Sequence, residues 1–257
     1  MQREVVESMT LVLALLGVGV VVGAAAQRVT GMGFALLMAP FFALFFGPYE
    51  GILLMNVGGL VSSSLVLYTV WRDVDWQRFS LLLLGAIPGG VLGALVATRL
   101  DSATLQIIVG LVLIAGLTAS LAIAPRATSS SPVIGALLAG SVSGLTNATA
   151  GIGGPPIGIY AVSTGWKQHY LAATLQPLFI ALSASALLVK SLLSGAAPAL
   201  DWWIYPSMVA LIVAGLGVGS ALKTHVNEVA ARRAVVVFCY VGAISAVIDG
   251  VWVVSQQ

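Results

Sequence analysis

Charged residues are scarce in this chain. Only 8% of its 257 residues are Asp, Glu, Lys or Arg, whereas 59% are hydrophobic and the mean hydropathy is +1.06. A soluble domain carries about 25% charged residues. Because so few charges cannot cover a water-facing surface, the composition excludes a soluble domain and indicates an integral membrane protein.

Cysteine and histidine are almost absent, which removes several kinds of chemistry. The one cysteine, Cys239, excludes an intramolecular disulfide and a cysteine-based metal site, and the two histidines show no partner spacing. The sequence has no nucleophile–base pair and no phosphate-binding loop followed by Lys-Ser/Thr, and its net charge of +2 is too small to indicate a nucleic-acid partner. We therefore expect no cofactor, no metal and no enzyme activity, and an ATP-driven pump would need a partner chain.

Long apolar runs are what the chain has instead. A bilayer core takes about 20 helical residues. Eight runs come close to that length or exceed it, at 9–26, 51–71, 79–98, 105–124, 132–150, 170–193, 203–222 and 234–254. Two shorter stretches, 34–46 and 155–165, are spans, half-spans or re-entrant arms. Uninterrupted runs favour helices over barrel strands, so we predict an all-α polytopic membrane protein with eight firm transmembrane helices and up to ten membrane segments.

The N-terminal run imitates a secretory signal peptide. Arg3 precedes an apolar stretch that ends in Ala24-Ala25-Ala26, which resembles a small-residue cleavage site. Glu4 and Glu7 argue against this interpretation. So does a repeat that places the same kind of segment in mid-chain.

The repeat appears when the sequence is shifted by 120 residues. Gly31 then falls on Gly151 and Asn56 on Gln176. A loop that is six residues longer changes the shift to 126, which brings these pairs together: Asp75-Trp76 and Asp201-Trp202, Gly89 and Gly215, Gly93 and Gly219. We predict one membrane domain of two repeats, 1–125 and 132–257, joined by a short polar connector at 126–131.

The basic loops predict how the two repeats insert. One basic loop, 71–78, precedes the Gly-x-x-x-Gly helix of the first half, and the other, 223–233, follows the equivalent helix of the second half. Because Lys and Arg concentrate in cytoplasmic loops, the halves are predicted to be inverted, with both termini outside. Five segments per half satisfy this, as do three helices and a re-entrant hairpin; Arg28, Arg126 and Lys167 then lie at or near the basic side.

Glycine-rich breaks interrupt both halves at matching places. Residues 144–158 read GLTNATAGIGGPPIG, and the first half has Gly31-Met32-Gly33. Inverted-repeat transporters build their site from discontinuous helices whose N-termini point at anionic groups, and Pro155 suits the first turn of a new helix. The alternative is that both breaks are ordinary loops at the membrane surface.

Neutral amides and hydroxyls accompany the breaks and can donate to an oxyanion without fixing a counter-charge. Interhelical hydrogen bonding, worth about 0.6 kcal/mol on average in membranes, is the alternative role. The predicted substrate-binding residues are Gly31, Gly33, Asn56, Thr146, Asn147, Gly151, Gly153, Gly154 and Gln176. Gln27 and Thr30 also precede the first break.

Other features have two interpretations each. The Gly-x-x-x-Gly helices predict close packing, either between the halves or in a homodimer. Arg28 either attracts an anion or is an interfacial positive charge. Asp249, in the last apolar run, either couples protons or is an interfacial carboxylate.

These motifs resemble those of the sulfite exporter TauE/SafE family of bacterial membrane transporters. The likeness rests on the two glycine breaks, on Arg72-Asp73-Val74-Asp75-Trp76 and on the Gly-rich helix that follows it, and it spans nearly the whole chain. The second break, Gly151-Ile152-Gly153-Gly154-Pro155, matches the family pattern better than the first, where the family usually has a longer glycine run.

The resemblance implies a multi-pass protein of the bacterial cytoplasmic membrane that moves sulfite, sulfonates or related organosulfur anions, usually outward. We expect a secondary transporter that works by alternating access. Its substrate is expected to be a small anion, and its surroundings are the lipid bilayer. Two alternatives stay open: a transporter of another small solute or cation, and a non-transporting membrane assembly partner.

Overall fold

The computed structural model describes residues 2–122, 132–194, 202–222 and 228–255, and in these residues it contains ten α-helices, one 3₁₀ turn and no strand. The first half of the chain forms α1 (Gln2–Thr30), α2 (Gly33–Phe46), α3 (Pro48–Val70), η1 (Trp71–Asp73), α4 (Trp76–Arg99) and α5 (Ser102–Ala122). The second half forms α6 (Pro132–Ala150), α7 (Gly154–Ser163), α8 (Gln168–Ser194), α9 (Ile204–Leu222) and α10 (Glu228–Ser255). The predicted all-α polytopic class is confirmed.

Five helical segments in the described part of the chain are long and apolar enough to cross a membrane: Glu50–Asp73, Trp76–Arg99, Pro132–Ala150, Gln168–Val189 and Ile204–Leu222. Four further apolar stretches are shorter, at Ala14–Thr30, Phe34–Phe46, Ala103–Gly116 and Ala243–Ser255. The structure thus assigns a helix to each of the eight predicted runs. Five of these helices are both long enough and apolar enough to cross a membrane.

The two short arms do not reach across a bilayer. At about 1.5 Å per residue, the 14 residues of α2 and the 10 residues of α7 extend about 21 and 15 Å, against a hydrocarbon core of about 30 Å. Each arm packs on the helix before it, α2 on α1 and α7 on α6. Of the interpretations left open for 34–46 and 155–165, a half-span arm that folds back therefore fits the structure.

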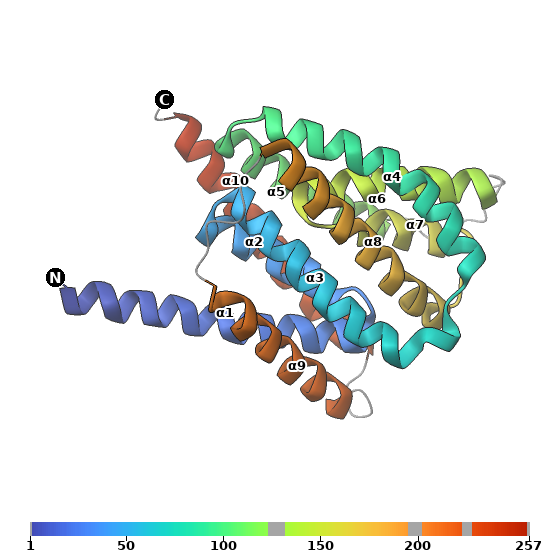
Figure 1. The fold of residues 1–257 in the computed structure, drawn as a ribbon, viewed down its shortest axis with the longest axis horizontal. Coiled ribbons are helices and arrows are strands. Elements are labelled where there is room, and N and C mark those ends of the chain that lie inside the picture. Colours follow the sequence, from blue (N-terminus) through green and yellow to red (C-terminus); the bar gives the residue numbers. More distant parts are fainter. Residues whose placement is uncertain (1, 123–131, 195–201, 223–227, 256–257) are drawn as a thin grey trace.

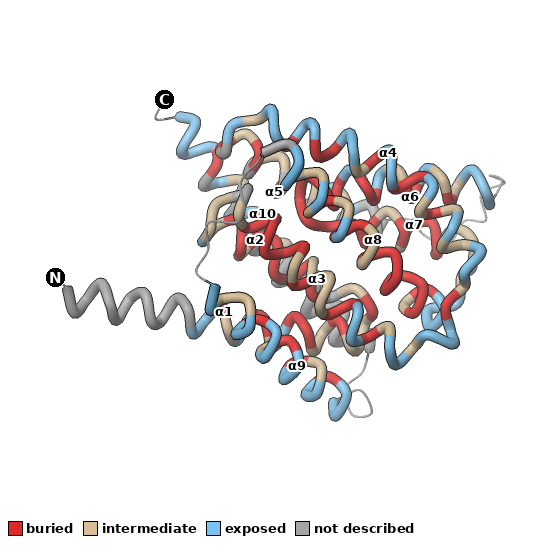
Figure 2. The backbone as a smooth tube through the Cα atoms, in the orientation of Figure 1, coloured by how far each residue is buried: buried red, intermediate tan, exposed pale blue. Residues whose placement is uncertain are grey.

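The outer surface is apolar and the interior holds the polar side chains. Leu138 is 62% exposed and Leu192 is 75% exposed, and exposed segments cover the periphery of the tube in Figure 2. Among the residues whose side chains the structure describes, eleven polar ones are buried: Gln27, Asn56, Ser62, Ser63, Ser143, Thr146, Asn147, Thr149, Thr174, Gln176 and Ser183. This distribution suits a protein surrounded by lipid, which exposes apolar groups and turns polar groups inward.

Glycines bring helices of one half against helices of the other. α4 packs on α6 and α9 packs on α1, while α3 meets α8 and α5 meets α10. A Cβ at Gly89 would overlap the Ser141 carbonyl, and one at Gly215 would overlap the Val21 carbonyl. The Gly-x-x-x-Gly positions thus hold the two halves of one chain together, as small residues do between membrane helices.

Basic side chains gather at one end of the bundle. Arg28 contacts Thr69 near the end of α3 and Ser220 near the end of α9, and the α3–α4 connection contacts α8. In Figure 1 this connection is at the right, whereas both labelled chain ends are at the left. We call this the basic end, defined by Arg28, Arg72, Arg78 and Lys167.

Candidate functional site

Each long helix that leads into a break ends in a left-handed glycine. Gly31 has φ +85° and Gly151 has φ +72°. Their N–H groups donate to the carbonyls four residues back, Gly31 to Gln27 and Gly151 to Asn147, both at 2.8 Å. Glycine at this position ends a helix without the penalty that a Cβ would bring. The two helices that lead into the breaks therefore end in the same way.

The breaks meet at one small buried cavity. Its lining includes Met32 from the first break and Gly151 and Gly153 from the second. A Cβ on Gly154 would lie 3.4 Å from the Met32 sulfur, so the breaks also approach each other directly. The remaining lining residues are Gln27, Phe34, Ala35, Met55, Gly59, Ser63, Asn147, Phe179 and Ser183. The breaks are thus buried between the halves, where irregular backbone is tolerated at membrane depth.

Two crossed amide pairs connect the halves, and one member of each pair, Gln27 or Asn147, lines this cavity. Gln27 Nε2 on α1 donates to Gln176 Oε1 on α8 at 3.1 Å, and Asn147 Nδ2 on α6 donates to Asn56 Oδ1 on α3 at 3.1 Å. The internal repeat relates the two pairs: a shift of 120 residues brings Gln27 onto Asn147 and Asn56 onto Gln176. All four side chains are 5% exposed or less. Each pair therefore links the helix before one break to the opposite half.

Further hydrogen bonds attach these amides to the breaks. Gln176 Nε2 donates to the Gly31 carbonyl at 3.0 Å and to the Ala172 carbonyl at 2.8 Å. Asn56 Nδ2 donates in the corresponding way to the Ile52 carbonyl at 2.7 Å. At the second break, Ser143 Oγ donates to the Gly153 carbonyl at 2.6 Å. The backbone of both breaks is therefore held by buried side chains.

The helices that leave the breaks begin at the cavity. α2 starts at Gly33 and α7 at Gly154, and neither has a side-chain hydrogen bond at its N-cap residue, Met32 or Gly153. Pro155 occupies the first turn of α7, where its missing N–H is no loss. Helix N-termini carry partial positive charge and free N–H groups. Both ends can thus stabilise negative charge without a cationic side chain.

Of the predicted residues, Asn147, Gly151 and Gly153 line this cavity, whereas Thr146 and Arg28 lie away from it. Thr146 is buried but lines a different space, and its Oγ1 donates to the Ser143 carbonyl at 3.2 Å. Arg28 is half-buried, and its Nε and Nη1 donate to Ser220 Oγ at 2.9 Å and Thr69 Oγ1 at 2.6 Å. Asp249 belongs to α10, but its side chain lies outside the described residues. The structure thus brings the amides and glycines together and holds the Arg28 guanidinium apart from them.

A larger groove lies between α5, α6 and α7. It measures about 530 Å³, and mostly apolar residues line it, including Val112, Leu138 and Ile159. Thr146 and Ile152 form its wall beside the second break. Its apolar lining does not suit a small oxyanion, so the central cavity remains the candidate site.

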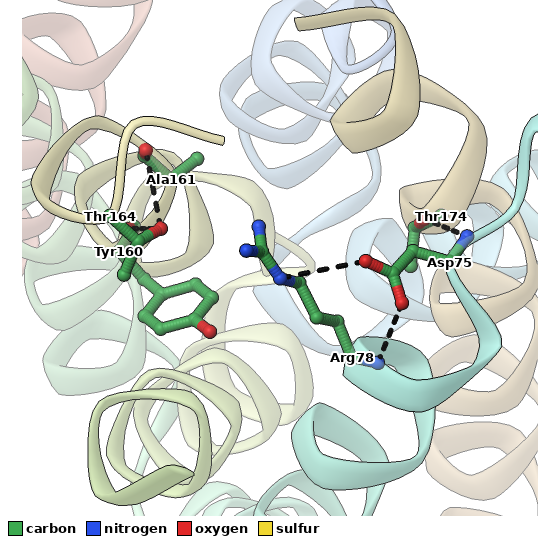
Figure 3. A network of polar contacts seen from close by, with 6 residues as sticks. All are labelled: Asp75, Arg78, Tyr160, Ala161, Thr164 and Thr174. Carbon is green, nitrogen blue, oxygen red and sulfur yellow. Dashed lines mark hydrogen bonds and ion pairs between the residues drawn. The ribbon is translucent and has the colours of Figure 1, made fainter. Parts of the chain in front are cut away.

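A polar network at the basic end fixes the start of α4 (Figure 3). Asp75 Oδ1 accepts from the Arg78 N–H at 3.0 Å and so caps α4, while the Asp75 N–H donates to Thr174 Oγ1 at 2.9 Å. Arg78 Nε lies 3.5 Å from Asp75 Oδ2, and the guanidinium stacks 4.6 Å from the centre of the Trp166 ring. The Asp-Trp motif of the first half is therefore a helix cap; its counterpart, Asp201, lies outside the described residues.

The predicted site residues omitted three polar side chains that the structure places at the cavity, Gln27, Ser63 and Ser183. Gln27 donates to Gln176 and, at 3.2 Å, to Ser63 Oγ, and it accepts from Ser62 Oγ at 3.0 Å. The signal for Gln27 was present in the repeat, because a shift of 120 residues brings it onto Asn147. The same shift brings Ser63 onto Ser183, and both line the cavity.

The fold and the cavity define a polytopic helical membrane protein with two half-span arms that start at facing helix breaks. The model of the sulfite exporter TauE/SafE family matches residues 15–246. The chain therefore belongs to this family of membrane transporters. Comparisons with curated proteins and with solved structures found no match.

Proposed function

We propose that this protein is a secondary transporter that exports a small anion, either sulfite or a small organosulfonate, across the bacterial cytoplasmic membrane. The observation that carries the proposal is the meeting of the two breaks at one cavity of neutral hydrogen-bond donors. Opposed N-termini of α2 and α7 border it, and such ends favour anions. The family match supports the same class of substrate.

The proposed mechanism is alternating access between two inverted repeats, 1–125 and 132–257. Matched packing of α4 on α6 and of α9 on α1 supports the duplication. The cavity offers about 20 Å³, which is room for one water molecule. A sulfite or sulfonate group therefore needs the halves to move apart. In this conformation the site is closed, and rocking of one half against the other would open it to either side.

Flux into proteoliposomes tests the function. Purified protein is reconstituted, and uptake of sulfite, methanesulfonate, sulfate and a cation is compared with that of protein-free vesicles. We expect saturable flux of sulfite or methanesulfonate. Flux of the cation alone would contradict the proposed substrate class, and co-purification of a stable partner without any flux would favour an assembly role.

Two variants test the site. Gly153→Leu fills the cavity at the second break, since even a Cβ there lies 2.8 Å from Ser143 Oγ, and Gln176→Leu removes a buried amide. Both are expected to abolish anion flux while the protein still elutes as a single species. Gly217→Ala is the matched control, because its Cβ meets nothing within 4 Å. Anion flux that survives both leucine variants would place the site elsewhere.

A further inference from the structure

The central cavity is polar without being charged. Of the residues that the structure describes, those that line it offer two amides, two hydroxyls, backbone groups and apolar side chains, but no Lys, Arg, His, Asp or Glu. Arg28 follows Gln27 directly in the sequence, yet its guanidinium is held by Thr69 and Ser220. The negative charge of an anion in this cavity would therefore be balanced by dipoles alone.

Two of those dipoles belong to the lining amides Gln27 and Asn147, each of which is hydrogen-bonded to a partner amide. Gln27 and Gln176 form one pair, and Asn56 and Asn147 form the other. In the closed conformation an amide of each pair donates to its partner's carbonyl oxygen, so a substrate oxygen has to replace that acceptor. Such an exchange keeps every buried N–H group paired, which matters because an unpaired buried donor costs about 1–3 kcal/mol.

A site of neutral dipoles discriminates by charge. The Born cost of moving an ion out of water grows with the square of its charge, so a dianion costs about four times as much as a monoanion of the same size. A cationic side chain would compensate for part of this difference, but the described lining contains none. The cavity therefore accepts a single negative charge far more readily than two.

We infer that the cavity selects singly charged oxyanions, with Gln27 as a further member of its donor set. Sulfite would then be carried as bisulfite. Sulfonates without a second acid group, such as methanesulfonate, would be carried because they hold one charge from mildly acidic to mildly alkaline pH. Sulfate, which carries two charges and a fourth oxygen on its sulfur, would be rejected. This inference rests on the proposed function and specifies the form of its substrate.

The pH dependence of flux separates the two forms of sulfite. Proteoliposomes with wild-type protein are assayed from mildly acidic to mildly alkaline pH with sulfite, methanesulfonate or sulfate, and the leak of protein-free vesicles is subtracted at each pH. Methanesulfonate keeps one charge throughout, so its flux reports any titration of the protein itself. Sulfite flux divided by methanesulfonate flux is the measured quantity.

The inference predicts that this ratio falls with rising pH in proportion to the bisulfite fraction, and that sulfate flux stays at background. A ratio that rises with pH, or sulfate flux equal to that of methanesulfonate, would overturn it while leaving anion transport intact. If none of the three anions crosses, the proposed function itself is wrong.

A charge placed in the lining gives a second test. Gln27→Lys adds a cation at the cavity and is expected to raise the sulfate-to-methanesulfonate flux ratio at least tenfold. Gln27→Asn keeps a neutral amide, so the ratio should stay that of the wild type even where the rate falls. Should the lysine variant fail to fold, the pH series with wild-type protein still tests the selection of singly charged anions. An unchanged sulfate-to-methanesulfonate flux ratio in a folded lysine variant would exclude Gln27 from the donor set.

Discussion

Position 151 sets two conditions that only glycine satisfies, one on the backbone and one on space. Its φ of +72° lies in the left-handed region, which costs other residues roughly 1–2 kcal/mol. A Cβ there would also lie 2.8 Å from Met55 Cγ on α3. The second break is therefore shaped by backbone conformation and by contact with the opposite half.

A matched pair of alanine substitutions separates these two conditions. Gly165 has φ +62° but a Cβ there meets nothing within 4 Å, so Gly165→Ala should lower the free energy of unfolding by about 1–2 kcal/mol. Gly151→Ala adds the overlap with Met55 and should cost about 2–4 kcal/mol. Thermal unfolding in detergent measures both; equal losses would mean that Met55 moves aside without cost.

Residue chemistry near the breaks was partly predictable from the sequence. Asn56, Gln176 and Asn147 could be predicted as site residues because each is an amide in an apolar segment and the first two align between the halves. That Asn147 meets Asn56 and that Gln27 meets Gln176 was not predictable. The pairing of the amides depends on where four helices cross, and the sequence pattern does not predict the position of that crossing.

At the scale of helices, α4 and α6 approach each other through glycine on both sides. Gly89 faces the carbonyl of Ser141, and Gly144 of α6 faces the carbonyl of Ala86. Small residues let membrane helices come this close, where dispersion and weak backbone contacts hold them. The contact joins the first half to the second, so its stability bears on any relative movement of the halves.

Two neighbouring glycines of α4 give an internal control for this packing. Gly89→Ala should force α4 away from α6 and destabilise the protein by about 1–3 kcal/mol. At Gly90 the nearest atom to a Cβ is the Gly144 carbonyl oxygen at 3.8 Å, an ordinary contact, so Gly90→Ala should be neutral or stabilising by up to about 1 kcal/mol. Denaturant or thermal unfolding compares them, and similar melting temperatures for the two variants would refute close packing at Gly89.

The helices themselves followed closely from the apolar runs, whereas their partners did not. Hydropathy placed a segment at each helix, and proline and glycine marked where α7 begins. The spacing of Gly89 and Gly93 predicted close packing but left open a partner within the chain or in a second copy. The structure shows α6 as the partner of α4, and the homodimer through the Gly-x-x-x-Gly helices stays an untested prediction.

At the scale of the whole molecule, most of the basic side chains that the structure describes lie at one end. The basic end carries Arg72 and Lys167, one from each half, in connections that follow α3 and α7. At the opposite end Asp101 caps α5 by accepting from the Thr104 N–H at 2.9 Å. That hydrogen bond lowers the pKa of the Asp101 carboxyl below its ordinary value.

The membrane class followed from composition alone, because a chain with 8% charged residues has no other way to cover its surface. The meeting of the two breaks required the fold. They are 120 residues apart in the sequence, and the fold brings them to one cavity that residues of α3 and α8 also line. Internal similarity indicated that the breaks correspond, not that they touch.

Orientation in the membrane is the remaining property of the whole molecule, and the charge bias predicts it. Because Lys and Arg concentrate in cytoplasmic loops, the basic end should face the cytoplasm. In a Cys239→Ser background, Arg72→Cys and Lys167→Cys should react with a membrane-impermeant thiol reagent only after the cells are permeabilised. Arg99→Cys, near the opposite end and exposed, should react in intact cells and leaves the Asp101 cap in place. If Arg72→Cys and Lys167→Cys reacted from opposite sides, the two halves would not be inverted repeats, and the proposed rocking about a shared cavity would lose its structural basis.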